Sequence, residues 1–328
     1  MEYSHTFDSV DIGQIDLEDQ RYRVSTDGPS EAMVASIKLV GVISPPIVCH
    51  GRGVTTSYTI VSGFKRLTAC RMIGLKKVVV KIISPDAPLE HRIRTAIIDN
   101  ALHRDLNFVE QASVIRLLDQ LYFEHEALCR EAGKLGVFVN LKMLKKLRLV
   151  AKMNPVLQRA LIQGDVALPV ALQIAEMEDH ATTDRLTMMF SDLGLGLNRQ
   201  RELLEWLKGI SHRDAISIHD LLEEDAIKRM LGDTDMDRGE KSRRLRRYFK
   251  GRRYPELTQA QDRFRAAVRA LKLGQGIELI APPHFEGQTY SLKIDFKRHQ
   301  ELLSKYKNIE TVVLSSALAS VLDPYTSD

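Results

Sequence analysis

The chain of 328 residues has little cysteine, a single tryptophan, no long apolar run and almost no net charge. Its three cysteines, Cys49, Cys70 and Cys129, lie far apart and form no CxxC pair. We therefore expect neither a zinc site nor a disulfide framework, which suits a reducing cytoplasm. No segment approaches the ~20 consecutive apolar residues of a membrane span, so we expect no membrane association. The first residues, MEYSHTFDSVDIGQ, are polar and acidic and do not predict a signal peptide.

The net charge is only +4, but cations gather in two segments. Residues 134–152 hold six Lys and Arg and no acid, and residues 235–253 hold nine Lys and Arg against three acids. Such a cluster indicates either a polyanionic partner or a solvated helix face. The length exceeds what one compact core can organise, so we expect two or three domains.

The first hundred residues alternate between helical and strand periods, which predicts an α/β domain. We expect helices at 31–41 and 64–74, and strands at 45–50, 57–63 and 76–83. From about residue 90 the pattern becomes helical and continues to residue 231. Asn107 and Glu110 have the spacing of a capping box at the start of a helical segment over 107–128. Trp206 lies at a position that we expect to be core.

The C-terminal part changes pattern again after Pro255. A helix over 258–274, two strands in GIELIAPP and QTYSLKIDF, and a closing helix over 298–312 are expected. An isolated hairpin buries little in water. We therefore expect a second copy of the chain to cover Ile277, Leu279, Leu292 and Ile294 in a homodimer.

The segment VSGFKRLTACRMIG (61–74) places two cations, Lys65 and Arg66, at the start of a helix. The positive end of the helix dipole and the unpaired N–H groups there disfavour cations and attract anions. One hypothesis is that an anion such as phosphate binds between Gly63 and these cations. The alternative is that both side chains extend into solvent.

A second candidate site lies in residues 134–152. If a helix starts near Asn140, the residues Leu141, Leu144, Leu147 and Val150 form an apolar stripe, and the lysines fall on another face. A helix and a glycine-containing turn at Gly133 and Gly136 precede it, which is a helix-turn-helix arrangement. We expect Asn140 and Lys142 to contact bases, and the remaining cations to lie on the DNA backbone: Lys145, Lys146, Arg148 and Lys152.

The order of these parts over residues 8–310 resembles the ParB/KorB-type partition proteins. Four segments carry the resemblance: GVISPPIVCH, SGFKRLTACRMIG, DNALHRDLNFVEQA and LRLVAKMNPVLQRALIQGDVALPVALQIAEM. It implies an α+β multi-domain protein with a ParB/sulfiredoxin-like N-terminal domain over 1–105 and a helix-turn-helix domain over 106–232. A basic linker or helix over 233–256 and a C-terminal helix–hairpin–helix dimerisation domain over 257–328 complete it.

The resemblance also implies a ligand. In that family the second box, which SGFKRLTACRMIG resembles, holds the triphosphate of CTP, and the third box, which DNALHRDLNFVEQA resembles, supplies polar ligands to phosphate and Mg²⁺. By matching position the nucleotide residues are Gly63, Lys65, Arg66, Asp99 and Asn100, with Asp99 and Asn100 near the metal. Implied partners are double-stranded DNA at a specific site and a second copy of the chain, in the nucleoid of the cytoplasm. Whether a partition ATPase also binds is left open.

Several positions depart from the family pattern. Phe64 stands where a polar residue is usual, Ser44 where Gln is common, and Asp99 where the family has Glu. His103 occupies the place of an Arg, with Arg104 next to it. Because hydrolysis depends on ångström-level geometry, these changes affect turnover of CTP more than its binding, and at most a weak CTPase is expected.

Three alternatives remain. A transcriptional regulator of a mobile element would use the same helix-turn-helix. A sulfiredoxin-like enzyme would need a nucleophilic cysteine in the phosphate loop, but Cys70 falls within the following helix, where a buried structural thiol is expected. A nuclease would need clustered carboxylates, and this region offers only Asp99 and Asp105 close together.

Overall fold

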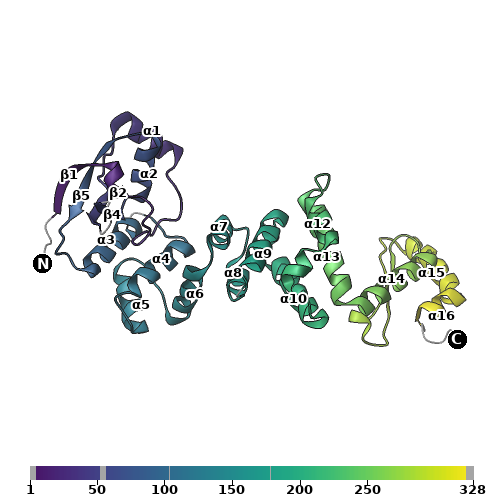
Figure 1. Cartoon of the computed structure of the whole chain (residues 1–328). Helices are drawn as coiled ribbons and strands as arrows, with labels where there is room; N and C mark the ends of the chain where they lie inside the picture. Colours follow the sequence, from purple (N-terminus) through teal and green to yellow (C-terminus); the bar gives the residue numbers. More distant parts are fainter. Residues whose placement is uncertain (1–4, 52–56, 103, 178, 323–328) are drawn as a thin grey trace. The chain divides into compact units, whose positions relative to one another are not determined.

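The computed structural model describes residues 5–51, 57–102, 104–177 and 179–322 (Figure 1). The chain divides into two compact units, Met1–Leu197 and Asn198–Asp328. The first unit joins the N-terminal sheet to the helices that follow it. The predicted domain limits at residues 105, 232 and 256 stay predictions. None of the helices in the described ranges is both long and apolar enough to cross a membrane.

The N-terminal elements confirm the predicted alternation of strands and helices. They are β1 (His5–Asp11), a short 3-10 turn (Ile12–Gln14), β2 (Ile15–Asp16), α1 (Glu31–Val40), β3 (Ile47–His50), β4 (Tyr58–Ser62), α2 (Phe64–Met72), β5 (Lys77–Ile83) and α3 (Leu89–Ala101). Ser30 caps the start of α1 by accepting from the Met33 N–H, and Gly41 ends it with a φ of 76°.

The five strands form one mixed sheet in the order β1-β5-β3-β4-β2. β1 and β4 run antiparallel to their neighbours β5 and β3, whereas β3 is parallel to β5 and β2 to β4. Alternate residues of β5, Val78, Val80 and Ile82, point into the core with Ile60 and Leu67. This period of two is the pattern that the sequence predicted, and it leaves the loops at the strand ends free to form a site.

The helices of the first unit continue from α3. They are α4 (Phe108–Leu118), α5 (His125–Lys134), α6 (Leu141–Lys152), α7 (Pro155–Gln163), α8 (Leu168–Ala175) and α9 (His180–Leu193). The capping box at Asn107 and Glu110 is confirmed. The helical pattern over 107–128 is divided, however, because Leu121 and Tyr122 both donate to the Leu118 carbonyl and end α4. No Gly or Pro marks this break.

The second unit is mainly helical around a small hairpin. α10 (Leu197–Asp214) is followed by α11 (Ile218–Leu222), α12 (Asp225–Gly232), α13 (Arg238–Arg253), α14 (Pro255–Ala270), β6 (Ile277–Ile280), a 3-10 turn (Pro283–Phe285), β7 (Ser291–Ile294), α15 (His299–Val313) and α16 (Ser316–Leu322). Trp206 is buried, as predicted. The two C-terminal strands pair antiparallel, with Leu279 opposite Leu292.

The hairpin is covered by its own chain more than the sequence predicted. Ile277 and Leu279 are buried in a cluster with Leu271, Leu273 and Val312, so no second copy is needed to cover them. Leu292 remains exposed. The sequence prediction treated the hairpin as isolated, whereas the flanking helices α14 and α15 fold back onto one of its faces.

Candidate functional site

The junction between β4 and α2 is built around Gly63. Its φ of 95° is left-handed, and a Cβ there would lie 2.9 Å from the Pro46 Cβ. Only glycine meets both demands without strain. Gly63, the N-cap of α2, also lacks a side chain that could accept from the first-turn N–H groups of that helix. Gly63 therefore has a structural role, because a larger residue would strain the turn between β4 and α2 even without a ligand.

Arg66 is held in a ring of oxygen atoms. Its guanidinium donates to the Ser44 carbonyl at 2.8 Å, to the Ser44 hydroxyl at 2.9 Å and to the Pro45 carbonyl at 3.4 Å. It also forms an ion pair with the Asp99 carboxylate at 3.0 Å, so that α3 is joined to α2. The Ser62 hydroxyl donates to the same carboxylate. The structure thus brings together Gly63, Arg66 and Asp99, three of the predicted nucleotide residues.

Lys65 forms a separate ion pair. Its ammonium lies 2.6 Å from the Asp27 carboxylate, which belongs to the loop before α1. Burial acts to raise the pKa of Asp27, but the hydrogen bond from Lys65 and the charges of Lys65 and Arg104 lower it overall. The side chains of Lys65 and Arg66 are only 22% and 20% exposed. The two hypotheses from sequence were a bound anion or free solvation; the protein on its own instead pairs each cation with a carboxylate.

Asn100 lies next to Asp99 but faces another direction. Its amide nitrogen donates to the Ala96 carbonyl of its own helix at 2.9 Å. This leaves the amide oxygen as the atom that can accept or ligate. The predicted His103 lies outside the described residues. Sequence analysis missed Ser62 and Asp27; Ser62 could have been suspected from its place beside Gly63, whereas Asp27 is 38 positions from Lys65 in the sequence.

Phe64, the departure in the second box, is explained by packing. Its ring is buried in the core of the sheet, and the Arg23 guanidinium lies 5.7 Å from the ring centroid. A side chain in this position is directed away from a ligand at the helix start. Replacing a polar residue by Phe therefore removes no group from the cluster of Ser44, Arg66 and Asp99.

The group around Gly63 has the chemistry to hold a phosphate. It offers the N–H groups at the start of α2, the Arg66 guanidinium and the Lys65 ammonium, all of which attract an anion. The Asp99 carboxylate lies beside Arg66, where it could bind a metal ion that accompanies the phosphate. Binding would require the phosphate to displace Asp99 from Arg66, or a metal ion to bridge the two anions. Three or more His, Cys, Asp or Glu side chains suited to hold a metal by themselves are not found together anywhere in the described ranges.

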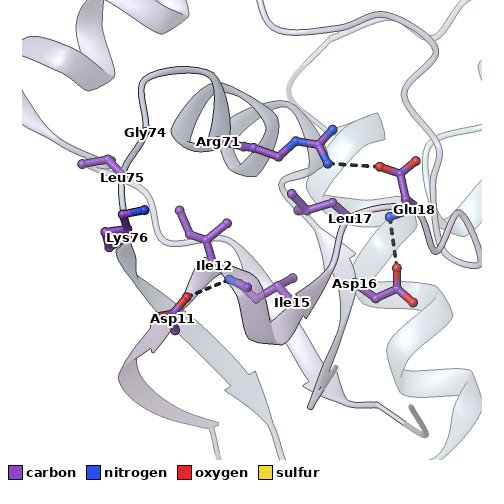
Figure 2. A pocket seen from close by; sticks show the side chains of 11 residues that line it. Asp11, Ile12, Ile15, Asp16, Leu17, Glu18, Arg71, Gly74, Leu75 and Lys76 are labelled. Atoms are coloured by element: carbon purple, nitrogen blue, oxygen red, sulfur yellow. Dashed lines mark hydrogen bonds and ion pairs between the residues drawn. The ribbon is translucent and has the colours of Figure 1, made fainter. Parts of the chain in front are cut away.

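A hollow lies at the opposite end of α2 (Figure 2). It has a volume of about 540 Å³ and is lined by both charged and apolar side chains, among them Ile12, Ile15 and Leu17. Arg71 points across it and pairs with Glu18 at 3.1 Å, while Asp11 accepts from the Gly13 N–H. Because Arg71 is already paired with Glu18 and the hollow's three carboxylates outnumber its two cations, this hollow is a poor site for an anion.

Glu110 connects the N-terminal domain to α4. Its side chain is fully buried, and both its oxygens accept from Arg104 at 2.6 Å. The N–H groups of Asn107 and Thr26 donate to it as well. Burial alone would raise the pKa of Glu110, but these hydrogen bonds and the Arg104 charge lower it overall. Sequence analysis named Glu110 only as a helix cap, because the partner in the loop at Thr26 is remote in sequence.

Cys70 is fully buried in the core. Burial raises the pKa of its thiol, which opposes formation of the thiolate. This is the buried structural thiol that the sequence predicted, and it does not suit a sulfiredoxin-like nucleophile.

The second site is the pair α5 and α6. Leu144, Leu147 and Val150 are buried as predicted, but Leu141 is 48% exposed. Gly133 belongs to the last turn of α5, and Gly136 alone provides the left-handed residue of the turn, with a φ of 86°. Leu141 escapes burial because it is the first residue of α6, where the helix has only begun to pack.

The predicted DNA residues divide into two groups. Lys142, Lys145 and Lys152 are exposed and Lys146 is half-buried, so these four can reach a polyanion. Arg148 instead binds the Asp119 carboxylate through its Nε at 3.1 Å and through a second guanidinium nitrogen. This hydrogen bonding to Asp119 raises the pKa of Arg148. The pair joins α6 to the end of α4, which gives Arg148 a structural role that its spacing did not indicate.

Asn140 is the N-cap of α6. Its side-chain oxygen accepts from the Met143 N–H at 2.8 Å. Asn140 therefore stabilises the start of α6, and its contact with bases stays a prediction.

The basic segment 235–253 forms α13, and several of its cations are occupied. Arg252 pairs with Glu224 at 2.5 Å and with Asp214 at 3.1 Å, and Arg246 pairs with Glu202. Leu245 and Phe249 are buried. The high charge of this helix thus serves in part to bind neighbouring helices of its own unit.

Comparison with known proteins is consistent with the N-terminal geometry. The ParB N-terminal domain family matches residues 2–101. A probable chromosome-partitioning protein ParB of Coxiella burnetii is 30% identical over 173 residues, which cover 52% of this chain and 55% of that protein. Its counterpart in Vibrio cholerae is 30% identical over 161 residues, 45% of this chain and 53% of that protein. The matches thus span little more than half the length of these relatives.

Solved structures also overlap with the chain. A C-terminally truncated ParB of Caulobacter crescentus complexed with CTP-gamma-S is 22% identical and covers 56% of this chain and 98% of that one, with a TM-score of 0.26. The same truncated protein complexed to the centromeric parS site is 20% identical, with 59% and 96% coverage and a TM-score of 0.31. At these scores the overlaps say nothing about the ligands of this chain.

Proposed function

We propose that this chain, whose residues 2–101 match the ParB N-terminal domain family, is a site-specific DNA-binding protein of chromosome or plasmid partition, gated by a nucleotide. One observation supports this most directly. A ParB N-terminal domain and a helix-turn-helix with an exposed lysine face, Lys142, Lys145 and Lys152, lie in the same compact unit. The alternative is a transcriptional regulator that uses the same two parts.

DNA binding rests on the two faces of α6. Its buried stripe anchors the helix against the unit, and its lysines face outward without a nearby acid in the segment 134–152. Such a helix can enter the major groove while its cations lie beside phosphates. Binding measured by fluorescence anisotropy should weaken steeply as salt rises, because each phosphate contact releases a counterion. An affinity that does not change between low and moderate salt would contradict it.

Partition and regulation are distinguished in the cell. Immunoprecipitation of the protein with its DNA across the genome should recover one palindromic cluster with spreading around it if the protein acts in partition. Scattered promoters would support the regulator. A neighbouring gene for a partition ATPase would favour partition and identify the further partner.

The N-terminal site is proposed to bind CTP with Mg²⁺. Arg66 and Lys65 would neutralise the phosphates, while the uncapped start of α2 donates N–H groups. Asp99 and Asn100 would hold the metal ion, which neutralises phosphate charge when bound. Turnover is expected to be slow or absent, because Asp99 is shorter than the Glu of the family and is bound to Arg66 and Ser62.

Calorimetry with the purified full chain tests the nucleotide. Titration with CTP and Mg²⁺ should give a measurable heat of binding, and the fitted affinity should be higher than that for ATP with Mg²⁺. Absence of heat with CTP well above a typical cellular concentration, from protein shown to be folded, would mean that Lys65 and Arg66 serve only their intramolecular ion pairs.

The remaining proposals concern assembly. We infer a homodimer in the cytoplasm, associated with the nucleoid, in which nucleotide binding closes two N-terminal domains around DNA. The family resemblance implies this clamp.

A further inference from the structure

Two large apolar side chains are exposed at the start of α6. Phe138, in the turn between α5 and α6, is 86% exposed, and Leu141, the first residue of α6, is 48% exposed. The Phe138 ring lies beside the end of α5, since a Cβ on Gly133 would be 3.8 Å from its Cδ1. The ring therefore lies against the α5 backbone while most of its surface faces outward.

The surroundings of this apolar pair are polar and cationic. Asn140 lies between the two residues in sequence, and Lys142 and Lys145 follow on exposed positions of α6. Lys134, at the end of α5, is also exposed. The acid beside Lys134, Glu131, is only 7% exposed, so cations dominate the exposed border. An apolar surface bordered in this way is complementary to a ligand that combines apolar groups with a polyanionic border.

Duplex DNA has this combination in the major groove. Thymine projects its C5-methyl group there, with phosphates on both sides, and apolar side chains contact this methyl group. Residues at the start of a recognition helix are the ones that contact base edges. Phe138 and Leu141 lie on either side of the N-cap of the predicted recognition helix, so they are in position for such contacts.

We propose that Phe138 and Leu141 determine sequence specificity by packing against thymine methyl groups in the major groove. This inference rests on the proposed DNA-binding function and adds the base that the site selects. It also gives a use to the exposed side chain of Leu141, which the helical period alone predicted to be buried.

Replacing thymine by uracil tests the contact, because it removes the methyl group and keeps base pairing and charge. The probe is a duplex selected by the full-length protein from random sequences, prepared with thymine or with uracil. The unmodified protein should bind the uracil duplex roughly three- to tenfold more weakly, since each covered methyl group contributes on the order of fourfold. A random-sequence duplex pair measures any effect of uracil on non-specific binding.

Phe138→Ser should bind the thymine duplex more weakly and reduce the preference for thymine over uracil, because only the contact of Leu141 remains. Phe123→Ser is the matched control, because Phe123 is 92% exposed but lies between α4 and α5 and not in the turn between α5 and α6. It should keep the preference of the unmodified protein. Both exposed positions should tolerate Ser, and circular dichroism checks that each variant is folded.

The outcomes separate this inference from the proposed function. Equal affinity of the unmodified protein for both selected duplexes, with a steep salt dependence, would overturn the methyl contact and leave DNA binding in place. Equal loss of preference in both Phe variants would also overturn it. Failure to bind any duplex at low salt would overturn DNA binding itself, and the methyl contact with it.

Discussion

At the scale of single residues, Arg66 is the side chain on which the nucleotide proposal depends most. Its guanidinium is held in place by bonds to Ser44, Pro45 and Asp99. A guanidinium already oriented by its neighbours loses little freedom when an anion binds. The same bonds mean that an incoming phosphate must compete with Asp99, and this competition limits its affinity unless a metal ion accompanies it.

Arg66→Ala should weaken CTP binding about tenfold to a hundredfold. It removes a charge-assisted contact of roughly 1.5–3 kcal/mol. Arg71→Ala is the matched control, since Arg71 lies on the same helix but pairs with Glu18 at the other end. Calorimetry of both variants with CTP and Mg²⁺ measures the difference. Equal weakening in the two variants would place the nucleotide elsewhere.

Glu110 makes the stability of the first unit depend on pH. Its pKa in the folded protein is below its ordinary value of 4.5, because bonds from Arg104 and from backbone N–H groups outweigh burial. A carboxyl group with a depressed pKa stabilises the fold above pH 4.5 and loses that contribution as pH falls through the folded value. Acid should therefore loosen the link between the N-terminal domain and α4.

Glu110→Gln tests this dependence. The variant should be less stable at pH 7 by about 1–3 kcal/mol, since Arg104 is partly exposed and regains some solvation. Between pH 5 and pH 3 it should lose less stability than the unmodified protein. Urea unfolding at several pH values measures both effects, and parallel curves for the two proteins would show that Glu110 does not titrate in this range.

At the scale of elements, α6 serves both packing and binding. Its inner face holds Leu144, Leu147 and Val150, and Arg148 joins it to α4 through Asp119. These contacts fix how the outer lysines are presented. Changes to the outer face should therefore affect DNA without unfolding the unit.

Reversing the charge of Lys142, Lys145 and Lys146 together to Glu should abolish binding to any duplex. Phosphate contacts dominate affinity, and three acids would repel the backbone. The matched control reverses Lys38, Lys76 and Lys77, which are exposed on the N-terminal domain and change the net charge equally. Anisotropy at low salt compares the variants. Similar losses in both would indicate an effect of net charge and remove the role of α6.

Asn140 requires two substitutions because it also caps α6. Asn140→Ser keeps an N-cap acceptor, so it should relax sequence choice with little change in stability. Asn140→Ala should add a loss of roughly 0.5–2 kcal/mol. Competition between selected and random duplexes reports sequence choice, and thermal unfolding reports the cap. Unchanged choice in Asn140→Ser would limit this residue to capping.

At the scale of the whole molecule, the C-terminal part still predicts a dimer, but through other residues than the sequence indicated. Ile277 and Leu279 are covered by their own chain. Exposed apolar residues remain on one face of α15, namely Leu303, Tyr306 and Val313. Their spacing of three and seven places them along a single helical stripe, which a second copy can cover.

Changing Leu303, Tyr306 and Val313 together to Ser should weaken the dimer, and a chain ending near Tyr254 should lose it. The matched control changes Phe7 and Val79, exposed apolar residues of β1 and β5, to Ser. Light scattering across a range of concentrations measures the state of each. A chain ending near Tyr254 that is as dimeric as the full one would contradict C-terminal dimerisation.

The local elements were largely determined by the sequence. The spacing of apolar residues predicted the strand before Gly63 and the basic helix after Asn140, and the residue types at 107 and 110 predicted the capping box. These signals can be read from the sequence because they act between residues close in the chain. The order of the motifs then indicated the resemblance to ParB-type proteins, and the ParB N-terminal domain family matches residues 2–101. The break after Leu118 escaped detection because no Gly or Pro marks it.

Only the tertiary structure decided how the charged residues are used. Lys65 meets Asp27, Arg66 meets Asp99 and Arg148 meets Asp119, each across a long interval of sequence. Likewise, the burial of Ile277 and the exposure of Phe138 follow from which neighbours fold against them. The type of a residue and its position in the sequence pattern indicate which kinds of group its side chain is able to bind. Which partner it binds depends on distances that arise when separate segments pack together, and local sequence does not encode them.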